Sequence, residues 1–174
     1  MDVRLRSLRD SPIFEGLSVP EIDSFLESTH VEELPDGGVV FADGDAGECL
    51  YLVASGRARI TKRSPDGKER HLGDIPEKMV FGEMSLLTGC PRSATIAASG
   101  GPLVLCRVDP GPFDRLVRGG SAAGAKLLYN VARSLARRLA QATDVLADEL
   151  GRKKAPDPGD LAVFKEQLLR QWTF

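Results

Sequence analysis

The spacing of apolar residues changes twice along the chain and divides it into three regions. Up to about residue 30 the spacing is helical, and from about residue 32 to 108 it changes to a period of two, with turns rich in glycine and aspartate between short runs. From about residue 121 to 150 apolar residues recur at steps of three and four. The pattern predicts an α+β fold with an antiparallel β-roll, jelly-roll-like, between N-terminal and C-terminal helices.

A short helix is predicted before the β-region. Ser18 and Glu21 have the spacing of a capping box, in which the two side chains satisfy free N–H groups at a helix start. Pro20 suits the first turn because its fixed φ matches a helix and no N–H is needed there. The apolar face of this helix consists of Ile22, Phe25 and Leu26.

The middle region contains several short β-strands joined by tight turns. Residues 42–47 and 55–56 contain glycines that can adopt a positive φ, and Pro65-Asp66-Gly67 is typical of a hairpin turn. Repeated hairpins favour antiparallel pairing. The predicted strands are 39–41, 50–53, 57–60, 68–72, 95–98 and 103–108.

Two further helices are predicted after the Pro/Gly cluster at residues 109–112. A short helix around residues 113–117 ends at Gly119-Gly120, and Ser121 is placed to cap a longer helix that reaches about Leu150. The apolar stripe of the long helix has coiled-coil spacing and consists of Leu128, Val131, Leu135, Leu139, Ala142, Leu146 and Leu150. Because this helix is long enough to extend beyond a small roll, we predict a homodimer through the stripe. The alternative is that the stripe only covers the roll.

The chain ends in a predicted linker and a short terminal helix. Residues 153–159 are rich in lysine, proline and glycine, and Asp160 can cap an amphipathic helix. Trp172 on this helix is interpreted as a core-packing aromatic residue, with an aromatic lid over a purine as the alternative. The predicted domains are 1–150, with the roll at about 32–108 and the long helix at about 121–150, and 151–174 for the linker and terminal helix.

Composition narrows the class of protein. With 174 residues, 42% hydrophobic and 28% charged, the chain can bury one core, and a net charge of −2 leaves no basic excess for direct DNA binding. No run of about 18 apolar residues occurs, so we predict no membrane segment. Three cysteines without metal-ligand spacing suit free thiols in a reducing compartment, which predicts a cytoplasmic protein.

Residues 81–95 form the stretch with the clearest chemistry, Phe-Gly-Glu-Met-Ser-Leu-Leu-Thr-Gly-Cys-Pro-Arg-Ser-Ala-Thr. Gly82 opens a short helical segment whose first N–H groups are free to face an anion, and Gly89 can end that segment. Pro91 then stiffens the return and delivers Arg92, whose planar guanidinium suits two phosphate oxygens. The stretch therefore contains the parts of a phosphate site, although a plain surface arginine is the alternative for Arg92.

Three neighbouring groups extend this site. The Ser93 hydroxyl and the Ala94 N–H supply further donors. Glu83 would repel a phosphate, but a carboxylate is a good acceptor for a ribose hydroxyl; the alternative is a carboxylate that only stabilises the helix start. A phosphate site beside a sugar acceptor indicates a nucleotide.

These fifteen residues resemble the phosphate-binding cassette of the cyclic-nucleotide-binding domain family. The resemblance extends over roughly residues 10 to 150, with 39–60 similar to the family's glycine-turned strand pair, 14–17 to its N-terminal helical bundle and 136–139 to its hinge helix. It implies that Glu83 accepts the ribose 2′-hydroxyl and Arg92 pairs with the phosphate oxygens. The ligand-binding residues that it implies are Gly82, Glu83, Met84, Ser85, Arg92, Ser93 and Ala94.

Two positions depart from the family pattern. Lys78 stands where the family usually has a turn glycine, so the loop at 76–79 is expected to turn differently. On the hinge helix, activator-like members place hydroxyl residues against the base, and the matching pair here is Ala142 and Thr143, which leaves Thr143 as the candidate. In the family a threonine at position 93 is associated with acceptance of cGMP. Ser93 leaves the choice between cAMP and cGMP open, and we favour cAMP.

The resemblance implies a switch rather than an enzyme. Ligand would draw the cassette helix inward and the hinge helix would follow, with Gly119-Gly120 as the pivot. Because only one linker and one helix follow Leu150, we predict output through a protein partner rather than through DNA. No metal or cofactor is expected besides the nucleotide ligand, since His30 and His71 lie in unrelated segments. The alternative function is a dimeric scaffold of the same fold with little or no nucleotide affinity.

Overall fold

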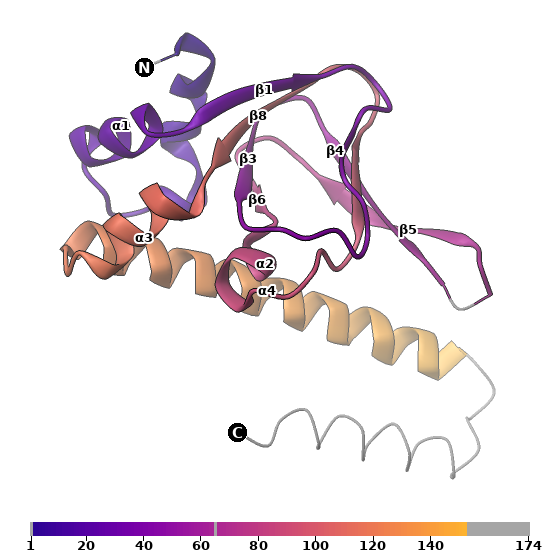
Figure 1. The fold of residues 1–174 in the computed structure, drawn as a ribbon. Coiled ribbons are helices and arrows are strands. Elements are labelled where there is room, and N and C mark those ends of the chain that lie inside the picture. Colours follow the sequence, from indigo (N-terminus) through magenta and orange to yellow (C-terminus); the bar gives the residue numbers. More distant parts are fainter. Residues whose placement is uncertain (1, 65, 153–174) are drawn as a thin grey trace. The chain divides into compact units, whose positions relative to one another are not determined.

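The computed structural model describes residues 2–64 and 66–152 of the chain (Figure 1). It contains two compact units, residues 1–132 and residues 133–174. The first unit holds the N-terminal helices, the β-roll and the start of the long helix α4, and the described part of the second unit continues α4. The predicted linker and terminal helix at 153–174, including Trp172, lie outside the described residues.

Three helices precede the roll. They are the 3-10 helices η1 (Val3–Asp10) and η2 (Pro12–Phe14) and the α-helix α1 (Val19–Glu27). The predicted capping box of α1 is present, with the Ser18 N–H donating to Glu21 Oε2 at 2.7 Å. The predicted apolar face is buried, and Phe25 packs edge-to-face against Phe14 with ring centroids 5.6 Å apart.

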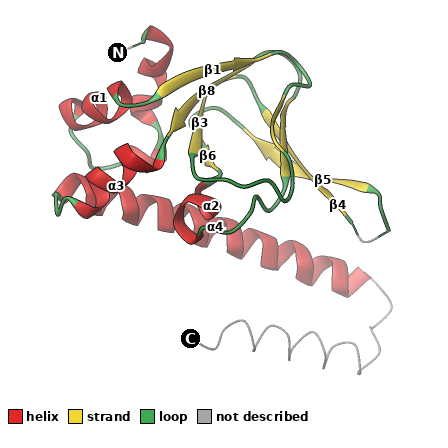
Figure 2. Ribbon diagram, viewed as in Figure 1, coloured by secondary structure: helices red, strands yellow, loops and turns green. Residues whose placement is uncertain are grey.

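Among the described residues, eight strands form two antiparallel sheets. Figure 2 shows the strands in yellow and the helices in red. The sheet orders are β1-β8-β3-β6 and β2-β7-β4-β5. The strands are β1 (His30–Leu34), β2 (Val39–Phe41), β3 (Leu50–Ser55), β4 (Ala58–Arg63), β5 (Glu69–Ile75), β6 (Val80–Phe81), β7 (Thr95–Ala98) and β8 (Leu103–Val108). The inward side chains of both sheets form one core, in which Val53, Ala58, Leu103 and Leu105 are completely buried. The predicted antiparallel roll is confirmed.

The strand boundaries agree with the sequence where turn residues flank an apolar run. Strands β2, β7 and β8 have the predicted bounds, and β3 continues two residues past its predicted end. Strands β4 and β5 each begin one residue later and end three residues later than predicted. Two strands were not predicted. Strand β1 has a half-exposed pattern with two glutamates and no clear alternation, and β6 has only two residues.

The three helices that follow strand β6 were all predicted, although α3 (Pro110–Arg118) begins three residues before its predicted start at residue 113. The cassette helix α2 (Glu83–Thr88) lies between Gly82 and Gly89, which have φ of 77° and 70°. Helix α3 starts at the Pro/Gly cluster, and α4 (Ala122–Arg152) follows it. The Gly124 N–H donates to Ser121 Oγ at 3.0 Å, so Ser121 caps α4 as predicted.

The first turns of α4 are fixed to the N-terminal segment by polar contacts. The Asn130 amide donates to the carbonyls of Ile13 at 3.0 Å and Glu15 at 2.9 Å, and Lys126 Nζ donates to the Gly16 carbonyl at 2.6 Å. Asn130 is 5% exposed, so these bonds replace water for two backbone carbonyls. The start of α4 and the N-terminal helices therefore form one packed block.

The predicted apolar stripe of α4 divides between core and surface. In the first unit Val131 is completely buried together with Leu127, which the stripe did not include, while Leu128 is 38% exposed. In the second unit Leu139 is 61% exposed. The side chains of Leu146 and Leu150 are not among those that the structure describes. The stripe thus contributes to the core at its start and is uncovered within the chain farther along.

The loop before β6 keeps a left-handed turn despite its lysine. Lys78 has φ of 67° and is the one non-glycine residue with positive φ among residues 2–64 and 66–152. Lys78 therefore adopts the left-handed conformation that usually favours glycine. Its N–H donates to the Val53 carbonyl at 2.7 Å, and its carbonyl accepts from Ser11 Oγ at 2.6 Å.

Within the described part of the chain, no helix is long and apolar enough to span a membrane.

Candidate functional site

The cassette is a short helix followed by a tightly bonded return segment. The Gly89 N–H donates to the Ser85 carbonyl at 2.8 Å, which ends α2. The return then pairs with the turn after β2: the Arg92 N–H donates to the Asp45 carbonyl and the Gly44 N–H donates to the Arg92 carbonyl, each at 2.8 Å. These two bonds fix the backbone of Arg92 beside residues 44–45 and direct its side chain to the inside of the roll.

The Arg92 side chain is buried and has no carboxylate partner. It is 4% exposed, and Nη1 donates to the Gly82 carbonyl at 3.0 Å while Nη2 lies 3.4 Å from Cys49 Sγ. Its guanidinium lies 4.2 Å from the Phe41 ring centroid, and Nε has no hydrogen-bond partner. Among the described residues, no carboxylate forms an ion pair with Arg92.

Two glycines make room for this guanidinium. A Cβ atom at Gly47 would lie 2.1 Å from Arg92 Nε, and one at Gly82 would lie 2.7 Å from Nη1. Contacts this short do not occur for real Cβ atoms, so any side chain at either position would displace the arginine. From the sequence, Gly47 is expected only to be a turn residue, because nothing in its local sequence indicates that residue 92 lies against it.

Arg92 is one wall of a cavity of about 450 Å³ at the edge of the roll. The other lining residues are Val40, Phe41, Asp45, Ala46, Gly47, Glu48, Cys49, Tyr51, Arg107, Asp109 and Pro110. Arg107, unlike Arg92, has carboxylate partners: Nη1 lies 3.3 Å from Glu32 and Nη2 lies 2.9 Å from Asp109. Of the two arginines in this cavity, only Arg107 forms an ion pair with a carboxylate of the described residues.

Tyr51 does not supply the missing negative charge. Its hydroxyl accepts from Cys49 Sγ at 3.4 Å. Burial, and after it this hydrogen bond, raises the pKa of the Tyr51 hydroxyl far above its ordinary range, so the group is neutral. The Tyr51 ring stacks on Phe81 with centroids 5.2 Å apart, and together with Phe41 these rings form the aromatic floor beneath Arg92.

The other predicted cassette residues divide between interior and surface. Glu83, Ser85 and Ala94 are buried, at 3%, 4% and 9% exposure, whereas Met84 is 52% exposed. Ser93 is exposed, with Oγ 3.9 Å from Met84 Sδ. Glu83 directly follows Gly82, whose carbonyl Arg92 bonds, but Glu83 does not line the 450 Å³ cavity.

The hinge-helix candidates Ala142 and Thr143 belong to the second unit. Both are exposed, and Thr143 Oγ1 donates to the Leu139 carbonyl at 2.9 Å, a bond within the helix. The seven predicted ligand-binding residues of the cassette, which lie between residues 82 and 94, all belong to the first unit.

The residues around the Arg92 guanidinium were missed by sequence reasoning. Phe41 and Tyr51 were predicted only as strand residues and Cys49 only as a free thiol, with no role at the site. Tyr51 in β3 and Cys49 directly before it belong to the core of the roll, but their proximity to residue 92 depends on how distant strands pair. Among residues 2–64 and 66–152, no group of three or more His, Cys, Asp or Glu side chains is arranged to hold a metal ion.

Comparison with known proteins identifies the family. Residues 31–119 match the model of the cyclic nucleotide-binding domain. The cyclic AMP receptor protein of Thermus thermophilus is 37% identical over 166 residues, covering 94% of this chain and 72% of that protein. A CRP-like cAMP-activated global transcriptional regulator of Mycobacterium tuberculosis is 31% identical over 137 residues, or 78% of this chain and 58% of the relative.

A solved structure supports the same relationship. The catabolite activator protein of Thermus thermophilus superposes with a TM-score of 0.71 at 36% identity, covering 81% of this chain and 63% of that one. This chain therefore spans less than two thirds of that structure and of the Mycobacterium regulator. The match to residues 31–119 includes the whole cassette and the strands that surround Arg92. The chain belongs to the cyclic nucleotide-binding domain family.

Proposed function

We propose that this chain binds a 3′,5′-cyclic nucleoside monophosphate, cAMP in preference to cGMP, and acts as a ligand-operated regulatory module rather than as an enzyme. The observation that carries the proposal is the Arg92 guanidinium, which is buried, borders a cavity and has no carboxylate partner in the described chain. A buried charge without a counterion is costly. A phosphodiester anion would offset that cost and accept hydrogen bonds from the unused donors of Arg92.

The proposed roles of the remaining cassette residues follow from the family resemblance. Glu83 would accept the ribose 2′-hydroxyl, and Gly82, Ser85, Ser93 and Ala94 would donate to the phosphate, with Met84 beside the ligand. Ala142 and Thr143 would meet the base. Because Arg92 bonds the carbonyl of Gly82, which directly precedes Glu83, ligand binding at Arg92 would draw the cassette helix that begins at Glu83 inward. This movement is the proposed switch, since ligand must bind one arrangement better than the other.

Calorimetric titration of the chain with cAMP and cGMP tests the proposal. We expect saturable binding of both nucleotides, tighter for cAMP, and Arg92→Ala should weaken cAMP binding by about 1.5–3 kcal/mol, the contribution of a hydrogen bond to a charged group. Arg59→Ala is the matched control, because Arg59 bonds Ser99 at 2.8 Å on the surface and does not line the cavity. Tighter binding of cGMP would contradict the choice of base.

A second variant separates a binding role of Arg92 from a structural one. Methionine can fill the space between the Phe41 ring and the two glycines without a charge, so Arg92→Met should raise the free energy of unfolding without ligand by about 1–2 kcal/mol. The same variant should lose the increase in melting temperature that cAMP gives the unmodified chain. Destabilisation without ligand would show that Arg92 mainly supports the fold. No binding to the unmodified chain at millimolar cAMP would favour the dimeric scaffold instead.

The output of the module is a separate proposal. We propose a homodimer through α4 and a protein partner in the cytoplasm, supported by the exposed apolar side chains Leu139 and Val145 and by three free cysteines. Direct DNA contact is the competing output, because one relative is named a transcriptional regulator and extends beyond the matched region. Titration of the chain with a random-sequence DNA duplex distinguishes them: no binding at physiological salt is expected.

A further inference from the structure

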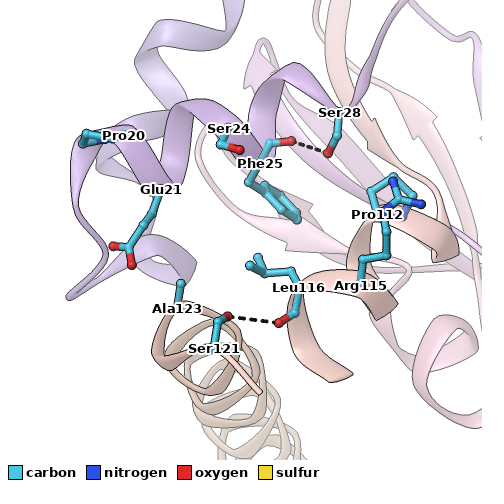
Figure 3. Close-up of a pocket in the computed structure, with 10 residues that line it drawn as sticks. All are labelled: Pro20, Glu21, Ser24, Phe25, Ser28, Pro112, Arg115, Leu116, Ser121 and Ala123. Carbon is cyan, nitrogen blue, oxygen red and sulfur yellow. Dashed lines mark hydrogen bonds between the residues drawn. The ribbon is translucent and has the colours of Figure 1, made fainter. Parts of the chain in front are cut away.

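A second pocket lies between α1, α3 and the start of α4, within the first unit and separate from the cassette (Figure 3). Its volume is about 560 Å³, within the range of small-molecule sites. Helix α1 contributes one wall, with Phe25 buried at its base, and Leu116 of α3 lies opposite. The remaining wall comes from Ser121 and Ala123 where α4 begins. The centre of the pocket is therefore apolar.

The two ends of the pocket carry opposite charges. In Figure 3 Glu21 lies at one end and Arg115 at the other, with Phe25 and Leu116 between them. The Glu21 carboxylate is already engaged by the Ser18 N–H and hydroxyl, each at 2.7 Å. These hydrogen bonds lower the pKa of Glu21, so it is ionised at neutral pH.

Arg115 has no partner for its charge. No hydrogen bond or ion pair of its side chain occurs among the described residues, and the nearby Asp114 carboxylate is occupied by Arg118, whose Nε lies 3.1 Å away. The hydroxyl of Ser24, on the α1 wall, likewise has no hydrogen-bond partner among the described residues. The Ser28 hydroxyl donates to the Phe25 carbonyl at 2.7 Å and retains only acceptor capacity. The unused donors of the pocket are therefore the guanidinium of Arg115 and the hydroxyl of Ser24.

We infer that this pocket binds an amphipathic monocarboxylate, a molecule with one carboxylate and an extended apolar body. The carboxylate would pair with Arg115, because a planar guanidinium matches two carboxylate oxygens. The apolar body would lie over Phe25 and Leu116, where it removes apolar surface from water. Glu21 would repel a second carboxylate at the far end, so the charge pattern selects against dicarboxylates.

The inference does not depend on nucleotide binding and can be tested without a nucleotide. The probes are octanoate, its dicarboxylate counterpart suberate and the uncharged 1-octanol, each titrated into the full chain. Amide chemical shifts in the NMR spectrum give both the affinity and the location. We expect saturable binding of octanoate with shifts at Ser24, Leu116 and Ala123, and at least about tenfold weaker binding of suberate and 1-octanol.

Matched variants of α3 decide whether the charge of Arg115 is responsible. Arg115→Gln should weaken octanoate binding about tenfold or more, whereas Arg118→Gln, on the same helix but paired with Asp114 and outside the pocket, should change it less than twofold. Ser24→Trp should block binding by filling the groove from an exposed position. Equal octanoate affinity in Arg115→Gln, or shifts confined to other surfaces, would overturn the inference.

Discussion

Lys78 holds a backbone conformation that side chains rarely adopt, and two hydrogen bonds keep it there. Its φ of 67° is left-handed, its N–H bonds the Val53 carbonyl and its carbonyl accepts from Ser11 Oγ. The conformation costs about 1–2 kcal/mol for a residue with a Cβ atom. The lysine ammonium offsets little of this, since its ion pair with Asp10 at 3.3 Å is exposed.

Lys78→Gly should therefore stabilise the chain. Glycine removes the strain but adds freedom to the unfolded chain, so we expect the free energy of unfolding to rise by about 0.5–1 kcal/mol in denaturant titrations. Lys78→Ala is the control, because it removes the ion pair and keeps the strain. If Lys78→Ala stabilises as much as Lys78→Gly, the strain assigned to this turn is wrong.

At the scale of elements, the buried Asn130 side chain connects α4 to the N-terminal segment. Its amide donates hydrogen bonds to the carbonyls of Ile13 and Glu15, and these bonds are buried and partly buried, respectively. Asn130→Ala removes both bonds at a buried position and should lower the free energy of unfolding by about 1–3 kcal/mol. Lys126→Ala, one turn earlier and more exposed, should cost less than about 1 kcal/mol, because water can replace its bond to the Gly16 carbonyl. Equal losses in denaturant titrations would contradict this ranking.

Most elements could be predicted from the sequence because their ends have local causes. Ser18, Gly89 and Ser121 start or end helices by capping, and turn glycines bound the apolar runs of β2, β7 and β8. Strand β1 could not be predicted, because its register is set by pairing with β8, about 70 residues later in the chain. The alternation of apolar and polar residues that predicts a strand is weak where the strand is half exposed.

The candidate site was predictable only in part for the same reason. The cassette sequence indicated Arg92, Gly82 and Glu83 through a recognisable motif. The aromatic floor and the room at Gly47 were not predictable, since Phe41, Gly47 and Arg92 meet only after strands from different parts of the chain pair. Long-range packing, unlike capping, leaves little trace in the sequence around a residue.

At the scale of the whole molecule, the exposed apolar residues of α4 predict self-association. Leu139 is 61% exposed, and such side chains on a long helix gain stability when a second copy covers them. Leu139→Glu should shift the mass measured by light scattering from dimer toward monomer. Gln141→Glu, exposed on a different side of the same helix, should leave the dimer intact. An unchanged dimer in Leu139→Glu would place the interface elsewhere.

The space left by Gly47 and Gly82 has a practical meaning for transplanting this arginine into another scaffold. Copying the motif from residue 81 to 95 would carry over Gly82 and Arg92 but not Gly47, which comes from a different loop. A grafted loop with alanine at the equivalent of position 47 would expel the guanidinium, although every residue that resembles a ligand contact had been copied. A designer would therefore have to graft two discontinuous segments. The second segment is needed only because Gly47 has no Cβ atom.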